Sequence, residues 1–357
     1  MTLGFDARFM SVPGGLGRYC RELLIEITAQ NPSDTFVVIV KTQPHDFPAR
    51  ANIRWIGCAI PWYGIAEQFS LGTLMNAQRD IDLWHIPHWN VPLTLRAPFV
   101  MTFHDFIFED FPTHDHTLKN FLRYKLKWLV WRALLKFNVH RARAIITVSN
   151  YVRDQIIARF PLAAKKITVV YPGLSRLPDP TPPPFDITHP FFLLVGNSYP
   201  HKNQAILLRL LAAHKFELPE HFYHLTHRDR FSEQLQKDID AAGFADRIHI
   251  VFDASDTTLA WMYAHCRALI FPSFSEGFGI PPLEALSFDA PVIAARTTSL
   301  PEILGDHAHW FDPRDSEQLF VTMQTIAANV MGGKNHAAKF TWRDAALSTQ
   351  KIYKNVL

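Results

Sequence analysis

The chain has 357 residues, three cysteines and a formal net charge of +3, and 48% of its residues are hydrophobic. This length exceeds what one hydrophobic core usually holds, so we expect two domains. No apolar run reaches the roughly 18–20 residues of a membrane span, the first residues lack a signal-peptide pattern, and the scattered cysteines lack metal-ligand spacing. These features argue against a membrane-spanning or disulfide-stapled protein, and we expect a cytoplasmic globular one.

The charge is distributed unevenly along the chain. Residues 1–171 hold 20 Lys and Arg against 13 Asp and Glu, whereas residues 172–357 hold 16 against 20. The first half is therefore expected to face something anionic. Nucleic acid is one such partner, but no helix-turn-helix, zinc-finger or RNP pattern is present, so we expect none.

The first half alternates strand-like and helix-like segments, which is typical of an α/β domain. Gly14, Gly15 and Gly17 precede a helix predicted over 18–29 and place backbone N–H groups at its start. Gly15 and Gly17 are therefore candidate ligand contacts, although a plain turn explains them equally well. The remaining segments are strands at 3–6, 35–41, 82–86, 98–103, 145–148 and 167–171, and a helix at 149–160 capped by Ser149 or Asn150.

His104 and Asp105 follow directly after the strand predicted at 98–103. The ends of parallel strands are where α/β sheets bind ligands, so His104 is a candidate site residue. The alternative is a buried, hydrogen-bonded histidine beside an aspartate that caps the next helix.

The stretch from Leu118 to Ala144 is basic, with no Asp or Glu between Asp115 and Asp154. A basic helix interleaved with Trp and Tyr has the composition of an interfacial segment. The alternative is a core helix with one solvated face. The residues that we expect at an anionic membrane surface or the acceptor are Lys119, Arg123, Lys125, Lys127, Trp128, Trp131, Arg132 and Lys136.

Residues 172–190 contain seven prolines, which no helix or sheet interior tolerates, so they predict a stiff linker. It separates a first domain, 1–171, from a second, 191–338, and a last segment, 339–357, is predicted to be helical. The second domain opens with a strand at 191–195. Further strands are predicted at 223–226 and 249–252, and helices at 231–242 and 257–265.

A possible diphosphate site follows the strand at 191–195. Gly196 and Asn197 begin the loop, and Lys202 stands near the start of a helix. A glycine that frees the backbone and a lysine suit a diphosphate, with His201 as a second source of positive charge. The alternative is a solvated surface lysine.

The most informative stretch runs from Ala268 to Ser287. A short apolar strand ends at Pro272, Gly277 and Gly279 let the backbone approach a ligand, and Pro281 and Pro282 fit the first turn of a helix. This strand, loop and helix N-terminus binds anions through free N–H groups, and Phe278 and Ile280 belong to the same loop.

Two carboxylates, Glu276 and Glu284, flank these N–H donors. Carboxylates only accept hydrogen bonds, so the pattern suits a molecule with a diphosphate in the middle and hydroxyls at both ends. A nucleotide sugar is such a molecule. The alternative is a buried connection whose glycines serve packing alone.

The string EGFGIPPLEAL, from Glu276 to Leu286, resembles the Glu-x7-Glu signature of retaining glycosyltransferases of family 4. Residues 259–273, 290–294 and 299–303 resemble the segments around that signature, and the likeness extends over most of the chain. It implies the GT-B fold, which has two Rossmann-like, doubly wound domains facing a cleft, with the last helix crossing back to the first domain.

The resemblance also implies roles for the candidate residues. Lys202 and the amides of the 277–279 loop would stabilise the departing diphosphate, Glu276 would hold sugar hydroxyls, and Glu284 would hold the ribose. His104 would lie beside the transferred sugar, with Gly15 and Gly17 close to the sugar and phosphates. The sequence departs from the family in lacking the arginine that usually accompanies the lysine, and in having Asp289 where a glycine is usual.

The implied function is retaining transfer of a hexose from a nucleotide sugar to a lipid-linked saccharide or polysaccharide, without a metal or other cofactor. GDP-mannose and bacterial polysaccharide assembly are favoured, with a dTDP-deoxysugar or a UDP-hexose as alternatives. The protein would be peripheral on the inner face of the plasma membrane. Other readings are a nucleotide-sugar epimerase, an α-glucan phosphorylase or a non-catalytic nucleotide-sugar binding module. Two Asp-x-Asp sequences, at 80–82 and 238–240, formally match a metal-dependent transferase, but we interpret both as coincidences.

Overall fold

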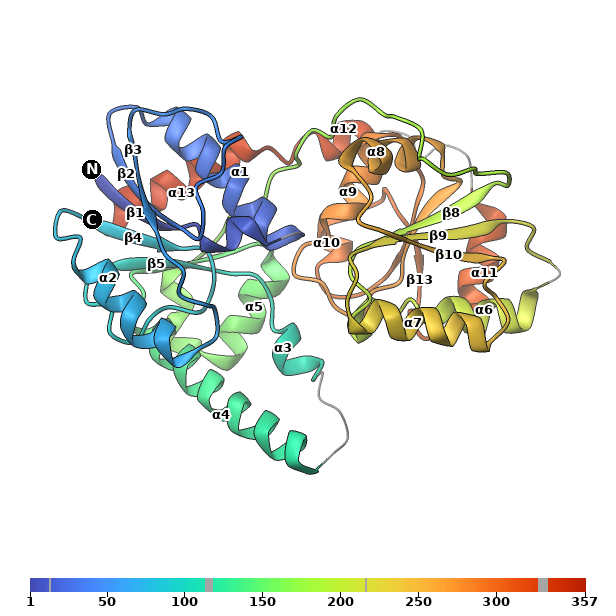
Figure 1. Cartoon of the computed structure of the whole chain (residues 1–357), viewed down its shortest axis with the longest axis horizontal. Helices are drawn as coiled ribbons and strands as arrows, with labels where there is room; N and C mark the ends of the chain where they lie inside the picture. Colours follow the sequence, from blue (N-terminus) through green and yellow to red (C-terminus); the bar gives the residue numbers. More distant parts are fainter. Residues whose placement is uncertain (13, 113–117, 216, 327–332) are drawn as a thin grey trace. The chain divides into compact units, whose positions relative to one another are not determined.

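The computed structural model describes residues 1–12, 14–112, 118–215, 217–326 and 333–357, and in the fourth helix it describes side chains from Lys125 onward. The chain divides into two compact units, one formed by 1–173 with 341–357 and the other by 174–340. Each unit is a parallel sheet with helices on both faces (Figure 1). Residues 170–190, between the two sheets in sequence, contain no helix or strand.

The first unit contains a seven-stranded sheet in the order β3-β2-β1-β4-β5-β6-β7, and every neighbouring pair is parallel. Its strands are β1 (Thr2–Asp6), β2 (Thr35–Val40), β3 (Ile53–Gly57), β4 (Leu83–Ile86), β5 (Phe99–Phe103), β6 (Ala144–Thr147) and β7 (Ile167–Val169). The central strands are almost wholly apolar because helices bury both of their faces. The strand order reverses between β1 and β4, which makes their carboxyl ends the expected ligand site.

Nine helical segments accompany this sheet among the described residues. They are η1 (Arg8–Ser11), α1 (Gly15–Gln30), η2 (Glu67–Leu71), α2 (Gly72–Asn76), α3 (Ile107–Asp110), α4 (Leu118–Arg141), α5 (Asn150–Arg159), η3 (Pro161–Lys166) and α13 (Trp342–Val356). The last of these, α13, packs along α1 (Figure 1). Tyr353 of α13 hydrogen-bonds to the buried His85 of β4, and a Cβ at Gly173 would lie 2.1 Å from the backbone nitrogen of Trp342. The end of the chain is thus a tightly packed part of the first unit.

The second unit contains a six-stranded parallel sheet in the order β10-β9-β8-β11-β12-β13. The strands are β8 (Phe191–Val195), β9 (His221–Thr226), β10 (Ile248–Phe252), β11 (Ala268–Phe271), β12 (Val292–Ala295) and β13 (His309–Phe311). The helices are η4 (Pro200–Lys202), α6 (Ile206–His214), α7 (Arg230–Ala241), α8 (Asp256–His265), α9 (Ile280–Ser287), α10 (Leu300–Leu304), α11 (Ser316–Thr325) and α12 (Gly333–Ala337).

The core of the second unit joins its sheet to α6, α7 and α11, through side chains such as Phe192, Leu210, Ile239 and Leu319. The helices α8, α9 and α12 lie on the opposite face of this sheet (Figure 1). The strand order reverses between β8 and β11, so the loops that follow these two strands flank the expected ligand site of this unit.

The doubly wound α/β prediction is confirmed, and the predicted strands and helices are present with small differences at their ends. The helix predicted at 149–160 is α5, and Ser149 caps it by accepting the N–H of Val152 at 3.2 Å. Asp289 has a φ of 57°, the left-handed conformation that glycine adopts most easily, so it replaces a glycine in a turn as predicted. The elements that were not predicted include the strands β3, β12 and β13, the helical segment over 67–76 and the helix α11.

Candidate functional site

The loop from β11 to α9 is built for close approach of a ligand. Gly279, the N-cap of α9, has a φ of 97°, and a Cβ there would also lie 2.6 Å from a methyl carbon of Leu300. Pro281 and Pro282 occupy the first turn of α9, where proline's missing N–H costs nothing. Two of the first residues of α9 thus have no N–H, and the N–H groups at this helix N-terminus come from Ile280 and the loop before it. The partial positive charge of the helix N-terminus still allows this end of α9 to receive an anion.

Two predicted site residues from separate elements meet beside this loop. Lys202 Nζ of η4 lies 2.7 Å from Glu276 Oε1, and their side chains are only 14% and 9% exposed. The backbone around Glu276 is fixed, because its N–H donates to Thr298 Oγ1 at 3.0 Å and its carbonyl accepts from Ser299 Oγ at 3.0 Å. The predicted lysine and carboxylate are therefore neighbours, held in place by the segment before α10.

Glu284, the second carboxylate of the pattern, lies inside α9 and is 2% exposed. The hydroxyl of Tyr263 in α8 donates to Glu284 Oε2 at 3.0 Å, which orients the carboxylate. Tyr263 was not predicted as a site residue, because its aromatic ring within a helical pattern indicates core packing, and nothing in the sequence signals its contact with a residue 21 positions away.

The loop after β8 carries the other predicted residues of this unit. Gly196 has a φ of 125°, and its carbonyl accepts from His224 Nε2 at 2.9 Å. The Asn197 carbonyl accepts from Gln204 Nε2 at 2.7 Å. Burial, and next the nearby Lys202, lower the pKa of His201 to about 4, so His201 is neutral at physiological pH. The prediction that His201 adds positive charge is therefore wrong, and Lys202 carries the charge of this loop.

Two buried hydroxyls in the same loops lack partners. Ser198 Oγ and Ser273 Oγ make no hydrogen bond to any described residue, and the residues are 9% and 1% exposed. They follow β8 and β11, the two strands that flank the switch point. Buried polar atoms normally have a partner, so these hydroxyls are suited to ligand oxygens. Serines are too common in loops for the sequence to have singled them out.

In the first unit, His104 follows β5 and its ring Nε2 donates to the Pro87 carbonyl at 2.9 Å. Its ring meets that of Tyr19 edge-on, with centroids 4.7 Å apart, and burial lowers the pKa of His104 to about 4. Asp105 Oδ1 accepts the N–H of Ile107 at the start of α3. His104 is thus a neutral, oriented imidazole at the carboxyl edge of the sheet, and its predicted role beside the sugar stays a prediction.

The two glycines of the first loop differ in what the fold requires of them. Gly15 is the first residue of α1. At Gly17 a Cβ would lie 1.9 Å from the Val12 carbonyl oxygen, so packing alone demands glycine there. Gly17 therefore gives no separate support for a ligand contact.

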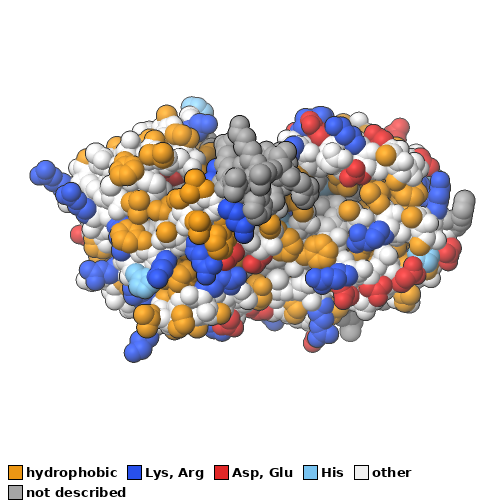
Figure 2. Space-filling view, turned by 90° about the horizontal axis from the view of Figure 1, so that it is seen from below, with side chains coloured by type: hydrophobic (Ala, Val, Ile, Leu, Met, Phe, Trp, Pro, Cys, Tyr) orange, Lys and Arg blue, Asp and Glu red, His pale blue; other side chains and the backbone are white. Residues whose placement is uncertain are grey.

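The basic helix α4 presents cations and apolar side chains to solvent. Figure 2 shows Lys and Arg side chains among hydrophobic ones on the face where α4 lies. Lys125, Lys127 and Lys136 are exposed, and Trp128 is half-buried beneath cations, with Lys125 Nζ 5.7 Å and Arg132 Cζ 5.1 Å from its ring. From Lys125 onward, the large apolar side chains that this helix exposes are Leu126, Leu129, Val130 and Phe137.

One of the predicted membrane contacts is wrong. Trp131 is 4% exposed and packs against Trp89, Phe106 and Phe108, with ring centroids 5.7, 6.5 and 5.5 Å away. Its side chain lies on the inner face of α4, so it belongs to the core. The side chains of Lys119 and Arg123, also predicted here, lie outside the described residues.

The Asp-x-Asp sequences have structural partners. Asp80 pairs with Arg54 at 3.0 Å and Asp82 accepts the N–H of Thr2, while Asp238 and Asp240 accept from glutamines one helical turn earlier. Within the described ranges, no group of three or more His, Cys, Asp or Glu side chains is placed to hold a metal ion.

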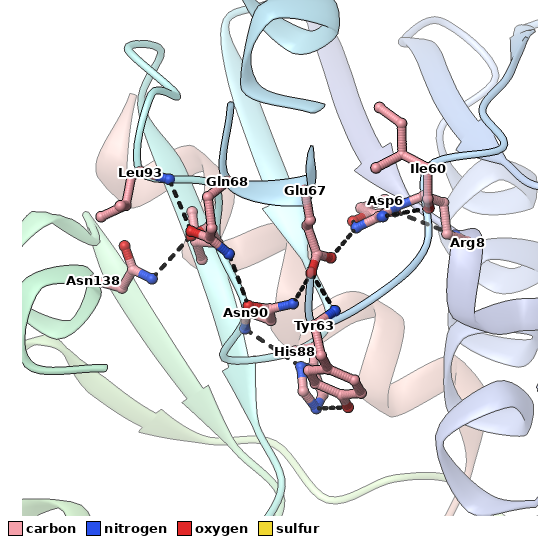
Figure 3. Close-up of polar contacts among 11 residues, drawn as sticks. Asp6, Arg8, Ile60, Tyr63, Glu67, Gln68, His88, Asn90, Leu93 and Asn138 are labelled. Atoms are coloured by element: carbon pink, nitrogen blue, oxygen red, sulfur yellow. Dashed lines mark hydrogen bonds and ion pairs between the residues drawn. The ribbon is translucent and has the colours of Figure 1, made fainter. Parts of the chain in front are cut away.

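Sequence reasoning missed a buried polar cluster at the switch point of the first unit. Arg8 bridges Asp6 and Glu67, and Glu67 continues to Asn90 and the backbone of Tyr63 (Figure 3). These residues are up to 84 positions apart, and only the sheet order brings them together.

Comparison with known families and proteins follows this division of the chain. The family described as "Glycosyltransferase Family 4" matches residues 13–176, and "Glycosyl transferases group 1" matches residues 179–331. The chain is 29% identical over 195 residues to the O-antigen chain mannosyltransferase RfbU of Salmonella typhimurium, covering 52% of each chain. It is 27% identical over 290 residues to O-antigen chain mannosyltransferase B of Escherichia coli, covering 76% of this chain and 74% of that one. The match thus spans about half of the first relative and about three-quarters of the second.

Solved structures share the whole fold. Sucrose-phosphate synthase from Thermosynechococcus elongatus has a TM-score of 0.78 at 17% identity, with 100% of this chain and 99% of that chain covered. Anabaena Alr3699/HepE, solved in complex with UDP-glucose, has a TM-score of 0.72 at 18% identity, with the same coverage. The two family matches together cover nearly all of the chain, and the solved structures agree with it over its full length. The chain is therefore a glycosyltransferase of family 4 with the GT-B fold.

Proposed function

We propose that the protein transfers mannose from GDP-mannose to a lipid-linked saccharide in bacterial polysaccharide assembly, with retention of configuration and without a metal ion. The mannosyltransferase relatives named above support the sugar and the pathway class. The Lys202–Glu276 pair beside the N-terminus of α9 is the observation that carries the proposal.

The chemistry follows from where charge develops during transfer. When the bond between the sugar and the diphosphate breaks, the leaving diphosphate gains negative charge. Lys202 and the backbone N–H groups of the loop over 277–279, which leads into α9, would provide positive charge for it, in the role that a metal ion plays in other transferases. Glu276, which contacts Lys202, is proposed to bind hydroxyls of the transferred sugar, and Glu284 the ribose hydroxyls.

Retention is proposed to proceed by attack of the acceptor on the face that the diphosphate leaves, with the diphosphate taking the acceptor's proton. A double displacement needs a carboxylate nucleophile at the sugar, and the resemblance supplies none for this role. His104 is proposed to lie beside the sugar as a neutral hydrogen-bonding group, in keeping with its low pKa.

We further propose that the enzyme works as a peripheral protein on the cytoplasmic side of the membrane, where a lipid-linked acceptor resides. No helix in the described part of the chain is long and apolar enough to cross a membrane. The exposed cations and apolar side chains of α4 support reversible attachment instead.

A donor screen tests the function directly. Purified protein is incubated in EDTA with GDP-mannose, dTDP-deoxysugars and UDP-hexoses, and with a lipid-linked saccharide extract as acceptor. We expect release of GDP from GDP-mannose only, and NMR of the product should show the configuration of the donor. Turnover that needs added Mg²⁺, an inverted product, or epimerised donor without transfer would each overturn part of the proposal.

A further inference from the structure

Five aromatic rings cluster at the switch point of the first sheet. Phe9 follows β1, and His88 and Trp89 follow β4, so three of the rings come from the strands between which the order reverses. Phe9 stacks on Trp62 with centroids 5.1 Å apart and lies 4.8 Å from His88, while Trp89 lies 4.9 Å from His88 and 5.7 Å from Tyr63. We call these five residues the aromatic platform.

Tyr63 of the aromatic platform has an unfavourable backbone conformation. It is 63% exposed although its ring contacts three others, and its φ of 59° lies in the left-handed region. Such a conformation costs a non-glycine residue about 1–3 kcal/mol, and it persists only where the surroundings impose it. Residues of this kind cluster at ligand sites, so Tyr63 calls for a functional explanation.

A buried network of ion pairs and hydrogen bonds holds the backbone of Tyr63 in this conformation (Figure 3). Glu67, fully buried, accepts the backbone N–H of Tyr63 at 2.7 Å and pairs with Arg8 Nη2 at 2.7 Å. Arg8 in turn pairs with Asp6 at 2.8 Å and donates to the Ile60 carbonyl, which fixes the start of the same loop. Breaking a buried ion pair of this kind costs several kcal/mol of folding free energy, about 3–5 in typical cases. The Arg8–Glu67 pair therefore fixes the loop that carries Trp62 and Tyr63.

The electrostatics of the platform do not favour an anion. The charge of Arg8 is used by two carboxylates. Burial, followed by the proximity of His104 and Arg8, keeps the pKa of His88 well below its usual value, so His88 is neutral. The N–H of Asn90 donates to His88 Nδ1 at 3.3 Å, so the ring proton lies on Nε2 and points to the Tyr63 hydroxyl, 3.4 Å away.

The remaining hydrogen-bonding groups suit a neutral ligand that carries hydroxyls. Tyr63 is 63% exposed and Trp62 and Trp89 are half-buried, whereas Phe9 and His88 are buried and support them. The accessible rings offer a surface for the C–H face of a pyranose, and the Tyr63 phenol can bind its hydroxyls. Trp62 Nε1 is buried without a partner among the described residues. His88 also follows Pro87, whose carbonyl holds His104, so the platform adjoins the histidine predicted at the transferred sugar.

We propose that the aromatic platform of Phe9, Trp62, Tyr63, His88 and Trp89 is a binding subsite for a neutral pyranose of the acceptor, and that Glu67 and Arg8 position its rim. This inference rests on the proposed function, since it assigns the acceptor side of that reaction. It also assigns the buried Arg8–Glu67 pair a role, positioning the loop that carries Tyr63, which the family resemblance did not imply.

The first test measures binding, so that it does not depend on transfer. Saturation-transfer NMR is recorded with methyl α-mannoside, an α-linked mannobiose and lactose as neutral saccharide probes. We expect saturation of the mannobiose ring protons by the wild type, lost in Tyr63→Gly and kept in Tyr63→Phe, which retains the ring. Tyr63→Gly removes the backbone strain, so its thermal midpoint should not fall, and lost binding would then reflect the missing ring.

Matched controls separate a sugar site from a membrane contact. Ile65→Ala and Phe69→Ala remove exposed apolar side chains, 81% and 54% exposed, from the same segment. We expect both to bind mannobiose like the wild type. If none of the three saccharides binds the wild type at millimolar concentration, or if Tyr63→Gly binds as well as the wild type, the proposal is overturned. Equal losses of vesicle binding in Tyr63→Gly and Ile65→Ala, with saccharide binding intact, would identify the platform as a membrane contact instead.

Kinetics then distinguish this proposal from the proposed function. We expect Tyr63→Gly to raise the KM for a saccharide acceptor roughly tenfold, as the loss of one aromatic contact implies. Binding of GDP-mannose, followed by thermal shift, and its slow hydrolysis in the absence of acceptor should not change. If the wild type binds no nucleotide sugar, the proposed function fails while the saccharide test stands by itself. If donor hydrolysis falls together with transfer in Tyr63→Gly, the platform serves the donor and the acceptor assignment is wrong.

Discussion

Lys202 and Glu276 compensate each other's charge in a nearly buried place. Their side chains are 14% and 9% exposed, and the atoms that face each other are 2.7 Å apart. In the proposed function, a diphosphate bound here would compete with Glu276 for the lysine, and the released carboxylate would accept hydroxyls of the sugar. The ion pair would keep both side chains in place until the donor binds.

This pairing leads to a prediction for Lys202→Ala. The charge on the leaving diphosphate grows in the transition state, so losing the lysine should lower kcat by about 10²–10³ and weaken donor binding much less. Steady-state kinetics with GDP-mannose measure both quantities. Lys237→Ala, which removes an exposed lysine of α7, should behave like the wild type. A kcat within twofold of the wild type would remove Lys202 from the mechanism.

At the residue scale, the sequence shows site residues that lie in recognisable loops and misses those joined by tertiary contacts. Lys202, Glu276 and Glu284 stand beside glycines and helix starts, which are visible as a local pattern. Arg8 and Glu67 are 59 positions apart, and no local pattern indicates that they pair. The neutral state of His201 was also unpredictable, because it depends on burial.

The helix α4 has one face buried in the core and one face exposed to solvent. Trp131 and Leu135 are buried, whereas Leu126, Leu129 and Val130 are at least half exposed. Exposed apolar side chains next to lysines are favourable only where they meet another apolar phase. A membrane surface offers one, and the lysines add attraction to anionic lipids, each worth about 1 kcal/mol near the surface.

We therefore predict that Leu126→Asp with Leu129→Asp weakens binding to anionic vesicles at least about tenfold, because two apolar contacts are lost. Their thermal midpoint should stay close to that of the wild type, since both side chains are already exposed, at 64% and 58%. Trp131→Ala should instead lower stability by about 3–5 kcal/mol, because it empties part of the core.

Vesicle sedimentation at low and high salt provides the measurement for α4. Binding should need anionic lipid and weaken as salt rises. Val321→Asp makes the same chemical change at an exposed position of α11 and should have no effect on sedimentation. If the wild type ignores anionic vesicles at low salt, α4 is a packed helix with a solvated face.

At the element scale, the strand β3 and the segment over 67–76 were missed because neither contains a strong apolar run. The strand β3 alternates partly exposed residues around Arg54 at the edge of the sheet, so it lacks the apolar run that marks the central strands. The segment over 67–76 has buried Glu67 and Gln68, which resemble surface residues until their partners are known. The exposed and buried faces of α4 could not be told apart either, because apolar residues surround the whole helix.

Several histidines of the molecule are buried and neutral. Burial lowers the pKa of His85 to about 3 and of His201 and His224 to about 4, from the usual 6.5. In the unfolded chain these groups take up protons as the pH falls below 6.5, while in the folded chain they remain unprotonated until about pH 4. Stability is therefore fully present above pH 6.5 and is lost as the pH falls toward 4.

We predict a steep fall of the thermal midpoint between pH 6.5 and pH 4. A histidine such as His224, which is 1% exposed, contributes roughly 3 kcal/mol over that interval for a shift of this size. Thermal shift assays at half-unit steps of pH measure the fall, and His224→Gln should make it shallower. A midpoint that stays level down to pH 4.5 would contradict the account.

The packing of α13 into the first unit has a consequence for the order in which the protein forms during synthesis. Because residues 174–340 make up the second unit, the ribosome finishes that unit before it reaches the last helix of the first. Tyr353 and Trp342, the partners of His85 and Tyr19, are synthesised only after the second unit, and until then the core beneath α1 is open. The second unit can fold as one continuous piece of chain, whereas the first, although begun earlier, is completed only after α13 has been synthesised.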